Sequence, residues 1–173
     1  MARSTSYSHP IASKVFERRN IVERYKKPAS GRPAISTAEY QALAEFRYQI
    51  RVFLRFSEQA ARAARIEPQQ HQLLLSVKNL NSRGWPTTVR AVAERLQIQH
   101  HSAVELIDRT ERRGLVKRQR RSEDRRQVEV ELTPRGERML RELTVHHRAA
   151  LSEAGPALVK ALETLLAAPP AVE

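Results

Sequence analysis

Apolar residues recur at helical spacings of three and four in several segments of the chain, separated by turn-forming residues. The first such segment is a helix expected from the N-cap Ser36-Thr37 to residue 66. Its apolar stripe comprises Leu43, Phe46, Ile50, Phe53, Leu54, Ala60 and Ala64. The helix is more than twice the usual length, so we expect part of it to project from a small domain. A partner subunit could then cover the stripe.

Three shorter helices are expected next. Pro68 opens the first of them, which ends before Gly84. Thr87 or Thr88 caps the second, and the turn Gln97-Ile98-Gln99 leads to the third, from His100 to Arg113. Gly114 ends that helix as a C-terminal cap. The side chains that should face the core from these last two helices are Val89, Val92, Ala93, Leu96, Ala103, Leu106, Ile107 and Thr110.

After Gly114 the hydrophobic period changes to two, which predicts a β-hairpin with strands 115–119 and 127–132 around a charged tip. Thr133-Pro134 then opens a last long helix. We expect it to break at Ala154-Gly155-Pro156 and to be followed by a short helix over 157–166. The fold class is therefore mainly α with a small β-hairpin wing.

This order predicts the organisation of the whole chain. Residues 1–36 form a basic flexible arm. Its apolar residues Ile11, Val15, Val22 and Tyr25 could line one side of a transient helix, and its serine and arginine content is also typical of a transit peptide. The remaining parts are a first dimerisation helix (37–66), a winged helix-turn-helix DNA-binding domain (67–133), C-terminal dimerisation helices (134–167) and a frayed tail (168–173).

In a winged helix-turn-helix, the second helix of the pair enters the DNA major groove. The residues expected to face DNA there are Gln99, His100, His101, Ser102, Val104, Glu105 and Arg109. Thr88 and Arg90, at the start of the preceding helix, are expected at the DNA backbone.

The hairpin tip holds four arginines, which suit the negative potential of a narrow minor groove. The tip residues expected at DNA are Arg120, Arg121, Asp124, Arg125 and Arg126. Asp124 would orient Arg126 or a neighbouring arginine by pairing with it. Elsewhere, an arginine-rich loop is usually only a solvated turn, but this one follows a candidate recognition helix.

Charge supports a polyanionic partner. The chain of 173 residues has a net charge of +12. Residues 1–35 contribute +6 and residues 84–126 contribute +5, whereas residues 127–173 are slightly acidic. The arm should therefore add a salt-dependent, mostly non-specific contribution to nucleic-acid binding.

Residues 37–166 resemble the MarR family of bacterial winged-helix regulators. The resemblance rests on the stretches 88–96, 102–109 and 112–116, the wing Glu123-Asp124-Arg125-Arg126, and the stretch 132–136. It implies an obligate homodimer with interlocked first and last helices, a pseudo-palindromic operator and a transcription regulator, here expected to be a repressor. It also implies that Asp124 and Arg126 are the wing aspartate and the minor-groove arginine. The long basic arm, and Thr110 in place of a larger aliphatic residue, depart from the family pattern.

The resemblance further implies release from DNA by a small aromatic or organic-acid ligand held between the dimer helices and the DNA-binding domain. The lining expected on the first helix is Phe46, Arg47, Tyr48, Arg51, Phe53, Arg55 and Phe56. The same aromatic residues at helical spacing would equally suit a dimer core with solvated arginines.

Several function classes are disfavoured. There is no cysteine, so thiol chemistry and thiolate metal sites are excluded. The paired histidines at 100–101 and 146–147 point apart on a helix, and we expect neither metal nor cofactor. No catalytic motif is present, so we expect no enzyme. The alternative is a winged-helix protein for architectural DNA binding or RNA, without a ligand switch. We expect a cytoplasmic, nucleoid-associated protein without a membrane span.

Overall fold

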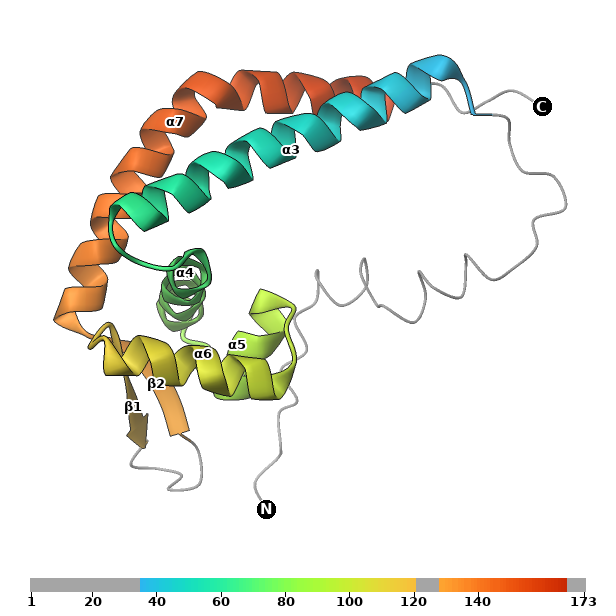
Figure 1. Ribbon diagram of the computed structural model, residues 1–173. Helices are drawn as coiled ribbons and strands as arrows, with labels where there is room; N and C mark the ends of the chain where they lie inside the picture. The colour runs from blue at the N-terminus through green and yellow to red at the C-terminus, as the bar shows by residue number, and fades with distance from the viewer. Residues whose placement is uncertain (1–34, 121–127, 168–173) are drawn as a thin grey trace, which may run out of the picture. The chain divides into compact units, whose positions relative to one another are not determined.

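The computed structural model describes residues 35–120 and 128–167 (Figure 1). It confirms a mainly helical fold with one β-hairpin. The elements in chain order are α3 (Thr37–Ala63), α4 (Pro68–Ser82), α5 (Val89–Leu96), α6 (His100–Arg112), β1 (Val116–Arg120), β2 (Val128–Leu132) and α7 (Pro134–Ala167). Nearly all of the predicted arm, the wing tip beyond Arg120 and the tail lie outside the described residues.

Local chemistry sets the ends of the three middle helices. At the start of α4, Pro68 occupies the first turn and the Gln70 side chain accepts a hydrogen bond from the backbone N–H of Glu67 (3.2 Å). Of the two predicted caps of α5, Thr87 and Thr88, the structure selects Thr88, whose hydroxyl accepts from the backbone N–H of Ala91 (3.2 Å). Gly114, which follows α6, has a φ of +66° that glycine adopts without strain.

The residues just before α5 pair with β2, a contact that the sequence did not indicate. β1 and β2 pair antiparallel with Val116 opposite Leu132. The carbonyl oxygen of Thr87 accepts a hydrogen bond from the backbone N–H of Val130 (3.0 Å), and Thr88 forms an isolated bridge with Glu129. These two contacts tie the start of α5 to β2.

The predicted break in the last helix is wrong. Residues 134–167 form a single helix, α7, with Pro156 inside it. Proline in a helix removes one backbone hydrogen bond, here to the carbonyl of Ser152, but does not have to end the helix when packing holds both sides. Figure 1 shows α7 bending along its length so that its later half runs beside α3.

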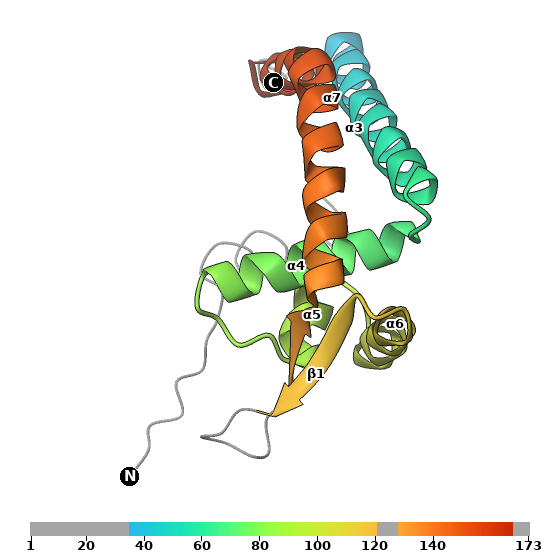
Figure 2. The same ribbon diagram turned by 90° about the vertical axis from the view of Figure 1, so that its left-hand side faces the viewer.

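One buried core fills the space between α4, α6, the hairpin and the first turns of α7. Its largest fully buried side chains include Leu73, Leu74, Ile107, Leu115 and Leu143. Figure 2 shows α7 rising from the hairpin past α4 toward α3. α4 contacts both long helices, α3 and α7, and α7 also contacts β2. These contacts join the long helices to the winged-helix domain.

Gly136 marks the point where α7 meets this core. A Cβ atom there would overlap the carbonyl oxygen of Leu115. Thr133, just before the helix, donates its hydroxyl to the carbonyl of Gly114 (2.6 Å) and accepts from the backbone N–H of Gly136 (3.1 Å). Its own N–H donates to Leu115 O (3.1 Å). These contacts fix the start of α7 against the turn between α6 and β1.

The two long helices leave apolar side chains uncovered. The large hydrophobic residues exposed on them are Tyr40, Leu43, Tyr48, Val52, Leu54, Val145, Leu151, Val159, Leu162 and Leu166. Within the described ranges, no helix is both long enough and apolar enough to cross a membrane.

Candidate nucleic-acid interface

The helix-turn-helix consists of α5, a tight turn and α6, with one face of α6 buried. The four side chains predicted to face inward, Ala103, Leu106, Ile107 and Thr110, are all buried. The hydroxyl of Thr110 donates to the carbonyl of Leu106 (2.7 Å), so this polar residue is satisfied in the core, at a position where the MarR family pattern has a larger aliphatic residue. In the turn, Gln97 adopts a left-handed conformation with φ +57°.

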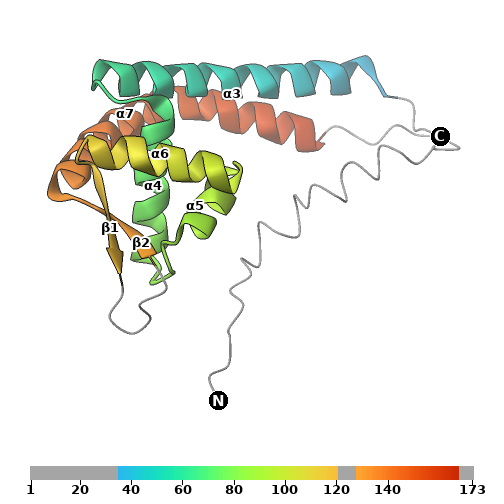
Figure 3. The same ribbon diagram turned by 60° about the horizontal axis from the view of Figure 1, so that its bottom comes forward.

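The opposite face of α6 carries the residues predicted to contact DNA. Gln99, His100, His101, Glu105 and Arg109 are exposed, whereas Ser102 and Val104 are half-buried. Figure 3 shows α6 lying across the domain beside α5 and the hairpin. These side chains are therefore displayed on a helix whose other face is anchored in the core. Base contacts by these residues remain a prediction.

Both predicted backbone contacts carry a group that can donate to a phosphate. The Thr88 hydroxyl oxygen accepts a hydrogen bond in capping α5, which leaves its O–H able to donate. The exposed guanidinium of Arg90 pairs with Glu94 one turn later, with 3.0 Å between Nε and the carboxylate oxygen. An exposed pair of this kind is weak and can exchange for a phosphate.

Of the five predicted wing residues, the structure describes one. Arg120 is exposed and is the last residue of β1. Arg121, Asp124, Arg125 and Arg126 lie outside the described residues.

Sequence reasoning missed a clamp between the hairpin and α6. On β1, Arg118 places one guanidinium nitrogen 2.5 Å from Asp108 Oδ1 and the other 2.5 Å from Glu111 Oε2. The other oxygen of Glu111 accepts from the backbone N–H of Arg118 (2.7 Å). Burial lowers the pKa of Arg118, but its hydrogen bonds to both carboxylates outweigh burial and raise that pKa overall.

A signal for this clamp was present in the sequence. Asp108 and Glu111 are spaced i, i+3, which places both carboxylates on one side of α6. Arg118 follows only four residues after the glycine that turns the chain back. A strand that leaves a helix through such a tight turn must pass beside the helix's last turns.

A second connection joins the end of α6 to the long helix α3. Arg113 donates to the side-chain oxygen of Gln70 (3.1 Å) and to the carbonyl of Arg65. Arg65 lies in the turn between α3 and α4 and has a left-handed φ of +57°. The end of α6 is therefore hydrogen-bonded to the α3–α4 turn, where α3 meets the winged-helix domain.

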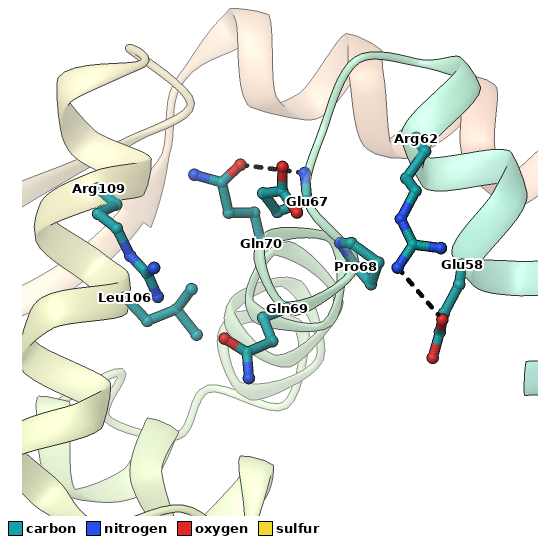
Figure 4. Close-up of a pocket in the computed structure, with 8 residues that line it drawn as sticks. All are labelled: Glu58, Arg62, Glu67, Pro68, Gln69, Gln70, Leu106 and Arg109. Carbon is teal, nitrogen blue, oxygen red and sulfur yellow. Dashed lines mark hydrogen bonds and ion pairs between the residues drawn. The ribbon is translucent and has the colours of Figure 1, made fainter.

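A cavity of about 370 Å³ opens beside this joint (Figure 4). Its walls come from α3, the start of α4 and α6, and its lining is Glu58, Arg62, Glu67, Pro68, Gln69, Gln70, Leu106 and Arg109. Arg62 is partly engaged by Glu58, at 3.4 Å. The lining contains none of the seven residues predicted on the first helix for a ligand.

Those seven residues instead lie along the middle of α3. Phe46, Phe53 and Phe56 are half-buried, whereas Arg47, Tyr48, Arg51 and Arg55 are exposed. The ring centroids of Phe53 and Phe56 lie 6.3 and 5.6 Å from that of His147 on α7, in edge-on geometry. These two aromatic rings contribute to packing within the chain, and their role toward a ligand remains a prediction.

His147 belongs to a buried histidine pair that sequence reasoning did not find. The rings of His147 and His71 have centroids 4.8 Å apart, and His71 is only 2% exposed. Burial, together with the neighbouring His147, lowers the pKa of His71 to about 4. No group of three or more potential metal-binding side chains occurs in the described residues.

Comparisons with known proteins agree with this architecture. A model of the MarR family matches residues 66–127, a range that contains α4, α5, α6 and β1 and ends before β2. A search of curated proteins finds no match to the sequence.

Solved structures of similar fold come from several bacteria. AbsC, a MarR family transcriptional regulator from Streptomyces coelicolor, is 20% identical, with a TM-score of 0.61 over 71% of this chain and 82% of AbsC. A MarR family protein from Bacillus stearothermophilus is 24% identical, with a TM-score of 0.58 over 69% and 81%. MepR in the S. aureus MepR–DNA complex is 21% identical, with a TM-score of 0.52 over 66% of this chain and 80% of the MepR chain.

Proposed function

We propose that the chain is a MarR family regulator, a sequence-specific repressor that binds double-stranded DNA as a homodimer; the match of residues 66–127 to the MarR family model supports this proposal. One observation carries the proposal: α6 buries one face completely and displays polar and basic side chains on the other, next to a basic hairpin. The proposed role in transcription regulation is also consistent with the expectation that the chain is not an enzyme.

The interface divides into two contacts with the duplex. α6 enters the major groove, where His100, His101, Glu105 and Arg109 meet base edges or phosphates. The wing reaches the flanking minor groove, where Arg126 is the inserted arginine and Asp124 orients it. The charge of +5 over residues 84–126 supports this placement because each neutralised phosphate releases counterions.

A second copy of the chain covers α3 and α7. The uncovered apolar side chains occur on both helices and extend beyond the winged-helix core, which is the surface that interlocked helices would bury. Two copies then present two recognition helices to a pseudo-palindromic operator.

Release by a small aromatic or organic acid is the regulatory part of the proposal. The ligand would bind between the dimer helices and the winged-helix domain, against residues 46–56 of α3. The cavity beside Arg62 and Arg109 lies between α3 and α6, which supports a ligand between the long helices and the winged-helix domain, but its lining does not include residues 46–56. Such a ligand must favour the arrangement that does not bind DNA, and a 100-fold loss of affinity requires about 2.7 kcal/mol of differential binding.

The experiment is selection of bound duplexes from a random pool by the full chain, followed by footprinting. A two-fold symmetric consensus sequence supports the proposal. Arg109→Ala should weaken the consensus about 10-fold or more and relax one position, whereas Lys160→Ala, an exposed cation far along α7, should not. Equal binding to random duplexes, or preference for RNA, would instead favour the architectural or RNA-binding alternative.

A further inference from the structure

The clamp formed by Arg118 is the most tightly bonded contact between the wing and the recognition helix. It joins one strand residue to two helix residues through three hydrogen bonds of 2.5 to 2.7 Å. Its guanidinium side chain is 27% exposed, compared with 52% for Lys117 next to it on β1. Bidentate pairs of this kind fix orientation as well as distance.

The position of the clamp determines what it can control. Asp108 and Glu111 are half-buried and contact Arg118 of β1, at the border of the buried face that holds Ala103, Leu106 and Ile107. The core sets how deeply α6 sits in the domain. A contact on its flank resists rotation about its own axis and lateral movement relative to the hairpin.

A protein that contacts two grooves at once requires a fixed relation between its two contacts. If α6 turns relative to the wing, base contacts in the major groove and arginine contacts in the minor groove cannot form together. Non-specific attraction to phosphates tolerates such movement because it depends mainly on charge. Loss of the fixed orientation between α6 and the wing should therefore lower the affinity for the operator more than the affinity for random DNA.

We propose that Arg118 is a positioning residue for sequence-specific binding, which holds α6 and the wing in one relative orientation through Asp108 and Glu111. The inference rests on the proposed DNA-binding function. It differs from a direct role at DNA, because the guanidinium is occupied by two carboxylates of its own chain.

The test compares two ways of breaking the clamp, each in the full chain. Arg118→Ala removes a positive charge, whereas the double variant Asp108→Ala/Glu111→Ala removes two negative charges and retains helix-forming residues. Affinity is measured for the selected operator and for a random duplex over a salt series. We expect both variants to lower the ratio of specific to non-specific affinity about 10-fold. The double variant should bind random DNA more tightly than the wild type does, because it is more positive.

Lys117→Ala is the matched control. Lys117 is the neighbouring strand residue and pairs with Glu131 across the hairpin (3.2 Å). The substitution removes the same positive charge as Arg118→Ala without removing a contact to α6. The ratio of specific to non-specific affinity should therefore stay within about 2-fold of the wild-type ratio. Arg118→Lys keeps the charge but loses the planar fork, and it should retain part of the ratio.

A readout without DNA separates this inference from the proposed function. The chain contains no cysteine, so spin labels can be placed only at introduced cysteines, here Glu105→Cys on α6 and Gln119→Cys on β1. Labelled chains are diluted with unlabelled chains, and the distance distribution is measured by pulsed electron resonance. Breaking the clamp should broaden the distribution, and Lys117→Ala should leave it narrow.

The outcomes separate clearly. Equal loss of specific and random binding in Arg118→Ala, with a salt slope reduced by about 0.9 and no loss of specificity in the double variant, would make Arg118 a phosphate contact and overturn the inference. An unchanged affinity ratio with a narrow distance distribution would also overturn it. If the wild type binds no DNA, the proposed function fails, and the distance measurement alone decides whether Arg118 orients α6.

Discussion

His147 on α7 is hydrogen-bonded to Ser57 on α3, with 2.8 Å between the ring Nε2 and the hydroxyl oxygen. The other ring nitrogen, Nδ1, lies 2.6 Å from the carbonyl oxygen of Leu143 and can only donate to it. A neutral ring must then accept the Ser57 proton at Nε2. The tautomer of His147 is thereby fixed, and the two longest helices share a buried polar bond.

Replacing Ser57 with alanine should therefore destabilise the fold. The buried Nε2 of His147 would lose its donor, at a cost of about 1–3 kcal/mol in the free energy of unfolding. Ser152→Ala is the control, since its exposed hydroxyl bonds only to the Arg148 carbonyl one turn earlier on the same helix. Denaturant unfolding of both variants measures the difference. An unchanged midpoint in Ser57→Ala would show that this bond contributes nothing.

The free energy of unfolding should decrease as the pH falls, because His71 is held neutral in the folded chain. Its pKa is about 4 in the folded chain against an ordinary value of 6.5, so the folded state favours the neutral ring. The unfolded chain binds the additional proton between those values, and stability is therefore complete above pH 6.5 and is lost as the pH falls toward 4. The expected loss is about 1–3 kcal/mol.

The measurement for this prediction is urea unfolding across the same pH window. His71→Gln, which cannot titrate, should show a shallower dependence on pH, whereas the exposed His146→Gln should follow the wild type. Parallel curves for the wild type and His71→Gln would assign the acid sensitivity to other groups.

The two glycines of α7 should respond oppositely to alanine. At Gly136 the new Cβ would overlap the backbone of Leu115, so Gly136→Ala should cost about 3 kcal/mol or more, or prevent folding. Gly155 has no atom within 4 Å of the corresponding position. Gly155→Ala should stabilise the helix by about 0.5–1 kcal/mol. Thermal unfolding monitored by circular dichroism compares the two variants directly.

The proposed dimer can be tested with two leucines of equal exposure. Leu162 on α7 and Leu75 on α4 are both 39% exposed, but only Leu162 lies on the helices expected to interlock. Leu162→Glu should weaken self-association at least about 10-fold, because a two-fold axis places the substitution at the interface twice. Leu75→Glu should leave the mass in sedimentation equilibrium unchanged. Equal behaviour of the two variants would contradict the proposed surface.

The winged-helix part of the fold could be predicted from sequence because its signals are local. Thr88 as a cap, Gly114 as a stop and the four inward residues of α6 depend on neighbouring positions, and all were correct. The continuity of α7 could not be predicted, because propensity alone places a break at Gly155-Pro156. Packing against α3 overrides that local preference.

The contacts that join elements were the least predictable. His71 and His147 are 76 positions apart, and nothing in the residues around either one indicates that they meet. The bond from Arg113 to Arg65 likewise depends on how α6 ends against the α3–α4 turn. Arg118 was closer to prediction, since its partners lie only 7 and 10 residues away.

The tight junction at Gly136 makes α7 a lever. With 34 residues, this helix extends about 50 Å along its path, and its first turn cannot slide over the Leu115 backbone. If the far end of α7 pivots against a second copy by about 5°, the near end sweeps through at most about 4 Å, because the bend makes the helix shorter from end to end than along its path. That arc is about one base-pair step, so a small change in how two chains cross would shift the recognition helices out of phase with their half-sites.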